Sequence, residues 1–174
     1  MERHRYMYGL LKGTVQGKHV LDIAPYSPLI WKRCLLDAGA ASVTSVDRWE
    51  RGNPLDPRDV SFADEYCDIV DIVGRFGPAS FDLVIMEQVL DEVLDYRRAL
   101  SAVSGVLAGG GTALVEVRVY WDIDGARSDV NRQFGDYWKF GQKHLLEVIG
   151  DSFSSVEFTE YNECGWTGHL FACG

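Results

Sequence analysis

Short runs of apolar residues alternate along this chain with segments in which apolar residues recur at helical spacing. The runs have the length of buried strands, and most are bounded by glycine, proline or polar residues. This pattern predicts seven strands, at residues 19–24, 42–47, 60–63, 81–86, 112–119, 156–161 and 169–173. It also predicts helices at residues 28–38, 69–76, 89–107 and 145–149, the third of which we expect the glycines at 109–111 to end with a left-handed cap.

The order of these elements predicts the fold. Repeated strand-helix-strand units form a parallel sheet that is covered by helices on both faces. The last two strands have no helix between them, so we expect them to pair antiparallel at one edge. The sequence therefore predicts one α/β domain over residues 1–174, with a Rossmann-like, doubly wound, mostly parallel seven-stranded sheet and an antiparallel strand pair at the C-terminus.

Composition narrows the class of function. The chain has 174 residues, 47% of them hydrophobic, and its 17 basic and 26 acidic residues give a net charge of −9. This balance argues against a nucleic-acid or anionic-membrane partner, because both need a basic face. We find no apolar stretch long enough for a transmembrane helix and no signal-peptide pattern. The four cysteines lack metal-ligand spacing, so we expect reduced thiols, a cytoplasmic location and no metal.

Candidate ligand-binding residues lie at the expected strand ends, because ligands of doubly wound sheets bind beyond the carboxyl ends of the strands. Asp22 lies near the end of the first strand, and Asp47 closes the second strand 25 residues later. An acid about 20 residues further on accepts the ribose hydroxyls in dinucleotide-binding folds, which predicts a ribose-binding role for Asp47, the alternative being a surface acid. Trp49 is a candidate for stacking on an adenine. Asp64 is a candidate for its amine, with Asp68 as the alternative.

Three further segments carry recognisable motifs. Residues 80–93 read SFDLVIMEQVLDEV, residues 106–111 read VLAGGG, and residues 134–140 read FGDYWKF. Together they resemble, in order and spacing, the fourth motif, the Leu-x-Pro-Gly-Gly turn and the Asp-Tyr-Trp-Arg-Phe segment of the class I S-adenosylmethionine-dependent methyltransferases, in particular the methyltransferase type 11 group. The resemblance covers roughly residues 18–174 and implies S-adenosylmethionine as the cofactor.

The first motif of that family departs from its usual form in this chain. The family has an acid followed by three alternating glycines, and the same places hold Asp22, Ala24, Tyr26 and Pro28. Glycine is used there because a Cβ obstructs a sharp turn and the close approach of backbone to ligand. The resemblance still implies cofactor contacts for Asp22, Ala24 and Tyr26, while the substitutions predict a reshaped or closed pocket.

The resemblance also implies which residues surround the reacting groups. Glu87 and Gln88 follow the fourth strand and are expected to line the crevice beside the transferred methyl group. The carboxylates of Glu87 and Asp124 are candidates for accepting a proton from a hydroxyl or amine of the acceptor. Residues expected to face the acceptor are Tyr120, Trp121 and Tyr137.

Two functions follow from this pattern. The first is transfer of a methyl group from S-adenosylmethionine to a small polar acceptor, such as a sugar or another metabolite, since the predicted sheet and helices use nearly the whole chain. The alternative is a catalytically inactive methyltransferase-like domain that binds a partner, which the lost glycines favour. Fold alone does not distinguish the two, and the pattern leaves the oligomeric state open.

Overall fold

The computed structural model describes residues 5–25, 28–48, 63–128, 138–163 and 166–174. Its helices are α1 (Arg5–Leu11), α2 (Pro28–Asp37), α3 (Ile72–Phe76), α4 (Tyr96–Val106) and α5 (Gln142–Gly150). Its strands are β1 (His19–Ile23), β2 (Ser42–Asp47), β3 (Glu65–Tyr66), β4 (Phe81–Glu87), β5 (Leu107–Glu116), β6 (Ala126–Ser128), β7 (Trp138–Phe140), β8 (Val156–Glu163) and β9 (Trp166–Cys173).

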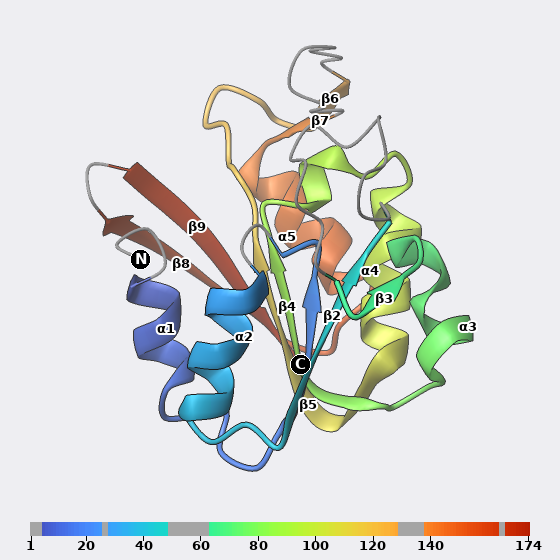
Figure 1. The fold of residues 1–174 in the computed structure, drawn as a ribbon. Helices are drawn as coiled ribbons and strands as arrows, with labels where there is room; N and C mark the ends of the chain where they lie inside the picture. The colour runs from blue at the N-terminus through green and yellow to red at the C-terminus, as the bar shows by residue number, and fades with distance from the viewer. Residues whose placement is uncertain (1–4, 26–27, 49–62, 129–137, 164–165) are drawn as a thin grey trace, which may run out of the picture.

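Seven strands form one sheet in the order β3-β2-β1-β4-β5-β9-β8 (Figure 1). The strands from β3 to β5 are parallel, whereas β9 runs antiparallel to β5, and β8 runs antiparallel to β9. The predicted fold class is therefore confirmed. Strand order reverses between β1 and β4, and this switch point positions the ligand crevice of doubly wound folds.

Alternating side chains of the strands divide the core into two layers. One layer packs against α1 and α2 and includes Val20, Ile85 and Leu114 from three neighbouring strands. The other layer packs against α3, α4 and α5 (Figure 1) and includes the residues that follow in those strands, such as Leu21 and Met86. Since successive strand residues point to opposite faces, each strand residue can be assigned to a face by its neighbours.

The predicted helix at 89–107 was too long. Residues 90–92 form a short 3₁₀ turn, and α4 begins only after Asp95, whose carboxylate accepts a hydrogen bond from the Arg98 amide at 3.1 Å. Between them, the carbonyl oxygens of Val93 and Leu94 accept the indole N–H of Trp138 at 3.0 and 3.3 Å. This contact spans more than 40 residues, so helical periodicity does not reveal it.

The three consecutive glycines do not end a helix as predicted. The helix ends at Val106, and Gly109, Gly110 and Gly111 all lie within β5, which begins at Leu107. Gly110 has a φ of +78°, and the pairing of β5 with β4 shifts register over this stretch. The glycines therefore form an irregular start of the strand, a role that glycine performs in strands as well as in caps.

Other boundaries also differ from the prediction. The third strand is Glu65–Tyr66 and follows Asp64, whereas the sequence pattern placed it at residues 60–63, of which only 63 is described. The closing strands are longer than predicted and include Gly168. The pattern did not predict α1, β6 and β7, because these elements are short.

Gly168 permits one close contact that ties the antiparallel pair to the rest of the sheet. Gly168 of β9 lies opposite Tyr161 of β8, and the phenol ring of Tyr161 occupies the space that a Cβ on Gly168 would take. The ring is buried, and its hydroxyl donates a hydrogen bond to a carboxylate oxygen of Glu116 at 2.7 Å. The sheet therefore needs a residue without a side chain at position 168.

We expect Gly168→Ala to lower the free energy of unfolding by about 1–3 kcal/mol, because the added methyl group overpacks against the Tyr161 ring. Urea denaturation measures this loss. Gly109→Ala is the matched control, since Gly109 also lies in a strand and the space that a Cβ would take there is open, with no surrounding heavy atom within 4 Å. The control should change stability by less than about 0.5 kcal/mol, and equal effects of the two substitutions would contradict the packing role of Gly168.

Candidate active site

Four acids lie at the carboxyl ends of four neighbouring strands, on both sides of the switch point. Asp47 ends β2, Asp22 is the fourth of the five residues of β1, Glu87 ends β4 and Glu116 ends β5. Glu87 and Glu116 are direct partners in the pairing of β4 with β5. Asp22, Asp47 and Glu116 are each no more than 4% exposed, and Glu87 is half-buried.

The four acids also share one face of the sheet. Each lies two or four residues after a member of the core layer that packs on α1 and α2, so strand alternation turns all four side chains toward that layer. The intervening residues, such as Leu21 and Val115, belong to the opposite layer. We call Asp22, Asp47, Glu87 and Glu116 the acidic row. Its members Asp22, Asp47 and Glu87 were predicted as site residues, and the structure brings them together.

Glu116 was missed because the pattern predicted that the fifth strand continues to residue 119. The structure ends β5 at Glu116, and the Tyr161 hydroxyl binds its carboxylate. The ring of Tyr6 in α1 stacks on Tyr161, with 4.1 Å between centroids and 11° between planes. An acid between Val115 and Val117 in an apolar run was the signal that could have revealed it, since a buried carboxylate needs compensation.

The backbone at the switch point is strained on both sides. Ala24, directly after β1, has a φ of +51°, and Gln88, directly after β4, has a φ of +56°. Their amides donate to the neighbouring strands, Ala24 to the Val46 carbonyl at 2.7 Å and Gln88 to the Glu116 carbonyl at 2.8 Å. Such left-handed residues other than glycine cost free energy and gather at functional sites. Ala24, at the place of the family's first glycine, thus has a left-handed conformation that glycine adopts without strain.

Two buried polar groups near the row have no hydrogen-bond partner among the described residues. They are the side-chain amide nitrogen of Gln88 and the hydroxyl of Ser45, the residue opposite Asp22 in β2. A buried polar group without a partner costs free energy that a bound ligand can recover. These groups, together with the carboxylates, give this end of the sheet both donors and acceptors.

The third strand places its two acids differently from the prediction. Asp64 precedes β3, and its carboxylate accepts hydrogen bonds from the Ser45 amide at 2.7 Å and from the Lys32 ammonium at 2.7 Å. Asp64 therefore anchors the start of β3 to β2. Asp68 is the acid that follows β3, and it accepts a hydrogen bond from the Val70 amide at 3.1 Å. The alternative assignment, Asp68, is thus the acid at the carboxyl end of the strand.

The segment after β5 is held against β7. The Tyr120 amide donates to the Phe140 carbonyl at 2.8 Å, and the Lys139 ammonium lies 5.5 Å from the centre of the Tyr120 ring. Trp121 is 62% exposed, and Asp124 is exposed as well. Asp124 lies beyond the end of β5 and is not a member of the acidic row. Tyr26, Trp49 and Tyr137, which were also predicted to bind cofactor or acceptor, lie outside the described residues.

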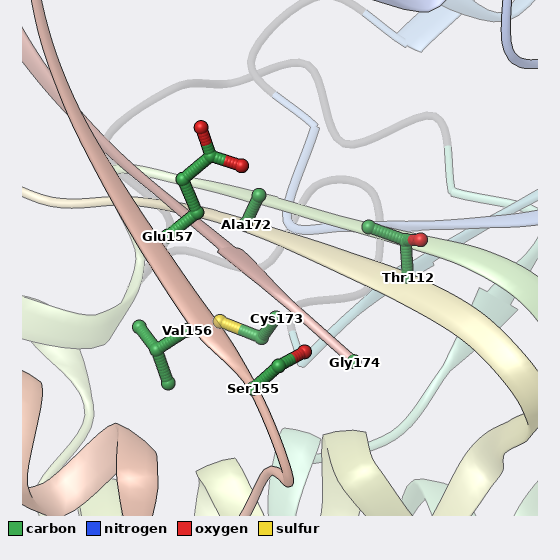
Figure 2. A pocket seen from close by; sticks show the side chains of 7 residues that line it. All are labelled: Thr112, Ser155, Val156, Glu157, Ala172, Cys173 and Gly174. Carbon is green, nitrogen blue, oxygen red and sulfur yellow. The ribbon is translucent and has the colours of Figure 1, made fainter.

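An open hollow of about 380 Å³ lies at the other end of the sheet, where β8 begins and β9 ends (Figure 2). The side chains that line it include one carboxylate, that of Glu157, and the thiol of Cys173. Burial raises the pKa of the Cys173 thiol to about 12, so this cysteine is protonated and unreactive at neutral pH. The hollow therefore lacks the row of buried carboxylates found at the other end of the sheet.

Metal-binding and membrane-spanning features were searched over the same described ranges. No three His, Cys, Asp or Glu side chains there lie close enough together to hold a metal ion. None of the helices in those ranges has the length and apolar character needed to span a membrane.

Comparison with solved structures agrees with this fold. A methyltransferase from Burkholderia thailandensis, solved with 1,6-didemethyltoxoflavin and S-adenosylhomocysteine, is 20% identical and has a TM-score of 0.71, with 97% of this chain and 76% of that chain covered. An S-adenosylmethionine-dependent methyltransferase from Mesorhizobium loti is 15% identical at a TM-score of 0.68, with both chains fully covered. A third such methyltransferase, from Archaeoglobus fulgidus, is 12% identical and has a TM-score of 0.71, with 99% of this chain and 91% of that chain covered.

Sequence comparison identifies the family. No curated protein gives a significant match. A family model described as a methyltransferase domain matches residues 29–115, which is 87 of the 174 residues and thus half of the chain. The matched region runs from α2 through β5. It includes β4, one of the two strands at the switch point, whereas β1 lies before it. The resemblance found in the motifs is therefore confirmed, and the chain belongs to the class I S-adenosylmethionine-dependent methyltransferases.

Proposed function

We propose that this methyltransferase acts on a small polar acceptor, such as a sugar or another metabolite, at the crevice above the acidic row. The observation that carries the proposal is the row itself, because four carboxylates on one face of four neighbouring strands favour a cationic ligand. S-adenosylmethionine carries a sulfonium and an ammonium group, and its activated methyl group is the chemistry that it supplies when bound. The Burkholderia methyltransferase was solved with bound 1,6-didemethyltoxoflavin, which supports a small-molecule acceptor.

The described residues fit this cofactor. Asp47 ends β2 with a buried carboxylate, which suits the two hydroxyls of a ribose. The free side-chain amide of Gln88 offers a donor, and Asp22 adds negative charge across the switch point. The left-handed turn at Ala24 keeps the sharp change of direction that the first motif requires. Asp68, after β3, is the remaining candidate for an adenine amine.

Glu87 is the proposed proton acceptor for a hydroxyl or amine of the acceptor. It ends a central strand, is half-buried and precedes the strained Gln88, so the strand holds its carboxylate in a defined position. General bases must lie within hydrogen-bond reach of the proton that they remove, which favours a residue on a rigid element. Asp124, on the exposed segment after β5, is the second candidate.

Tyr120 and Trp121 are proposed to contact the acceptor. They follow β5 closely, and the backbone bond from Tyr120 to Phe140 keeps the segment against β7. Aromatic side chains bind the apolar faces of sugars and heterocycles while their polar edges form hydrogen bonds. Tyr26, Trp49 and Tyr137 stay predictions for cofactor and acceptor contacts.

Calorimetric titration with S-adenosylmethionine and S-adenosylhomocysteine tests the cofactor site. We expect both to bind, and we expect Asp47→Asn to weaken both about ten- to hundred-fold, because the substitution replaces hydrogen bonds to a charged acceptor. Thermal unfolding without ligand should show that the variant is folded.

Asp151→Asn is the control for this titration. Asp151 is exposed, forms an ion pair with Arg97 at 3.2 Å and lies at the end of α5, so its loss should leave cofactor affinity unchanged. Absence of binding to the unmodified protein at millimolar cofactor would favour the inactive, partner-binding alternative. Binding that Asp47→Asn leaves within two-fold of the unmodified protein would disprove the ribose role.

A second prediction concerns the degenerate first motif. Ala24→Gly should raise cofactor affinity several-fold, because it removes a Cβ from the turn while keeping its left-handed backbone. It should also raise the free energy of unfolding by up to about 1 kcal/mol, since alanine is strained at positive φ. Isothermal calorimetry and urea denaturation measure the two effects.

Ala79→Gly separates strain from ligand approach. Ala79 also has a left-handed backbone, with a φ of +53°, but it lies before β4, at the opposite end of that strand from the crevice. The control should gain stability without gaining affinity. If both substitutions change affinity alike, the turn at Ala24 is not where the backbone meets the cofactor.

A further inference from the structure

His169 holds the chain that leaves β5 with both its backbone and its side chain. Its carbonyl accepts the Val117 amide at 3.2 Å, and its imidazole Nδ1 accepts the Val119 amide at 3.4 Å. His169 is 5% exposed, and it follows the face of Phe171, which packs in the layer beneath α3, α4 and α5. Its side chain therefore lies on the face opposite the acidic row.

The imidazole takes the place of a missing strand partner. The register of β5 with β9 ends at Glu116 opposite Leu170, and no backbone carbonyl of the described part of β9 is paired with the Val119 amide. The Nδ1 atom supplies that acceptor. One residue further on, the Tyr120 amide turns to the Phe140 carbonyl, and Val119 forms a parallel bridge with Phe140. Val119 is thus the point at which the chain leaves β9 for β7.

The hydrogen bond also identifies the tautomer. An imidazole nitrogen that accepts a hydrogen bond has no proton, so the neutral ring of His169 carries its proton on Nε2. The Nε2 atom is buried without a hydrogen-bond partner among the described residues, and the Glu160 carboxylate on β8 lies 3.7 Å from it. Because its lone pair is on Nδ1, this ring does not present a basic nitrogen toward a ligand. His169 is therefore better suited to hold the segment after β5 in place than to act as a general base.

Aromatic rings enclose the rest of the imidazole. The Phe158 ring of β8 stacks on it at 6.3 Å, and the Trp121 ring meets it edge-on at 5.8 Å between centroids. Trp121 is one of the residues that we propose for acceptor contact. His169 thus contacts both ends of the segment from Val119 to Trp121, the first by a hydrogen bond and the last by ring packing.

We propose that His169 is a positioning residue for the acceptor: in its neutral form it holds the segment from Val119 to Trp121 in place beside the crevice. The proposal rests on the acceptor role of that segment given above. Protonation of Nδ1 would set an N–H against the Val119 N–H and break the hold, so the segment should loosen in acid.

The electrostatic surroundings keep the ring neutral at pH 7. Burial lowers the pKa of His169 below its ordinary value, while Glu160, the one charged group that faces it from β8, opposes this change. Phe158, which is also on β8, and Trp121, from the segment after β5, carry no charge. A histidine whose pKa is lowered on folding contributes stability that is complete above the unfolded value near 6.5 and declines as the pH falls below it.

Amide hydrogen exchange at Val119 tests the proposal. At pH 7.5 we expect His169→Leu to speed exchange at Val119 about tenfold, because leucine has the size to pack but no acceptor. His169→Asn should restore much of the protection, since its amide oxygen can accept at the place of Nδ1. Lowering the pH to 5 should loosen Val119 in the unmodified protein and not in His169→Asn, once intrinsic exchange rates are corrected for pH.

Internal controls separate a local effect from unfolding. The amide of Leu114, within β5, should keep its protection in all variants, and His19→Asn, on an exposed histidine at the start of β1, should change neither amide. Affinity for S-adenosylmethionine should also be unchanged in the His169 variants, which keeps this result independent of the cofactor site. Unchanged Val119 exchange in His169→Leu, or a nitrogen spectrum showing a proton on Nδ1 at pH 7.5, would overturn the proposal.

Discussion

The burial of carboxylates in one row is the constraint on which this structure depends. Neighbouring parallel strands lie about 4.8 Å apart, so Glu87 and Glu116, which are partners in the pairing of β4 with β5, are close enough to repel one another. Buried charge of one sign is costly unless hydrogen bonds or opposite charge compensate it. At Glu116 the compensation is the Tyr161 hydroxyl, which reaches it because Gly168 has no side chain. At the site that we propose, a cationic cofactor would add a further favourable interaction with the row.

Backbone strain indicates a functional site in this protein only where it lies beside the acidic row. Three described residues other than glycine have a left-handed backbone, and Ala79 lies far from the carboxyl ends of the strands. Strain alone therefore does not mark a site. Ala24 and Gln88 differ because they follow the two strands at the switch point, next to buried acids and to an amide without a partner. The coincidence of strain, burial and topology supports the proposed site better than any one of them does alone.

The sequence pattern predicted well what depends on local periodicity. The strand at residues 42–47 matched, and the mostly parallel sheet with its antiparallel C-terminal pair followed from the alternation of elements. It failed where distant residues decide a boundary. Trp138 binds the Val93 carbonyl and shortens the predicted helix, and pairing with β4 draws the glycines after Val106 into a strand. The pattern assigned Asp64 to the end of a strand, but β3 begins after it. The Asp64 carboxylate accepts a hydrogen bond from the Ser45 amide, a contact between distant residues that the pattern does not reveal.

The same limit explains why the site was predicted only in part. Asp22, Asp47 and Glu87 could be predicted from the sequence because each ends or nearly ends a clear apolar run. Glu116 and His169 could not, because the run through Val119 gives no sign of where β5 parts from β9. Where β5 separates from β9, its polar groups turn to different faces of the sheet. Glu116 turns toward α1 and α2 and binds Tyr161, whereas the next amides turn to His169 on the other face. The end of β5 thus contributes a carboxylate to the acidic row and also directs the chain that we propose for acceptor contact, so the backbone of β5 connects the two parts of the proposed site.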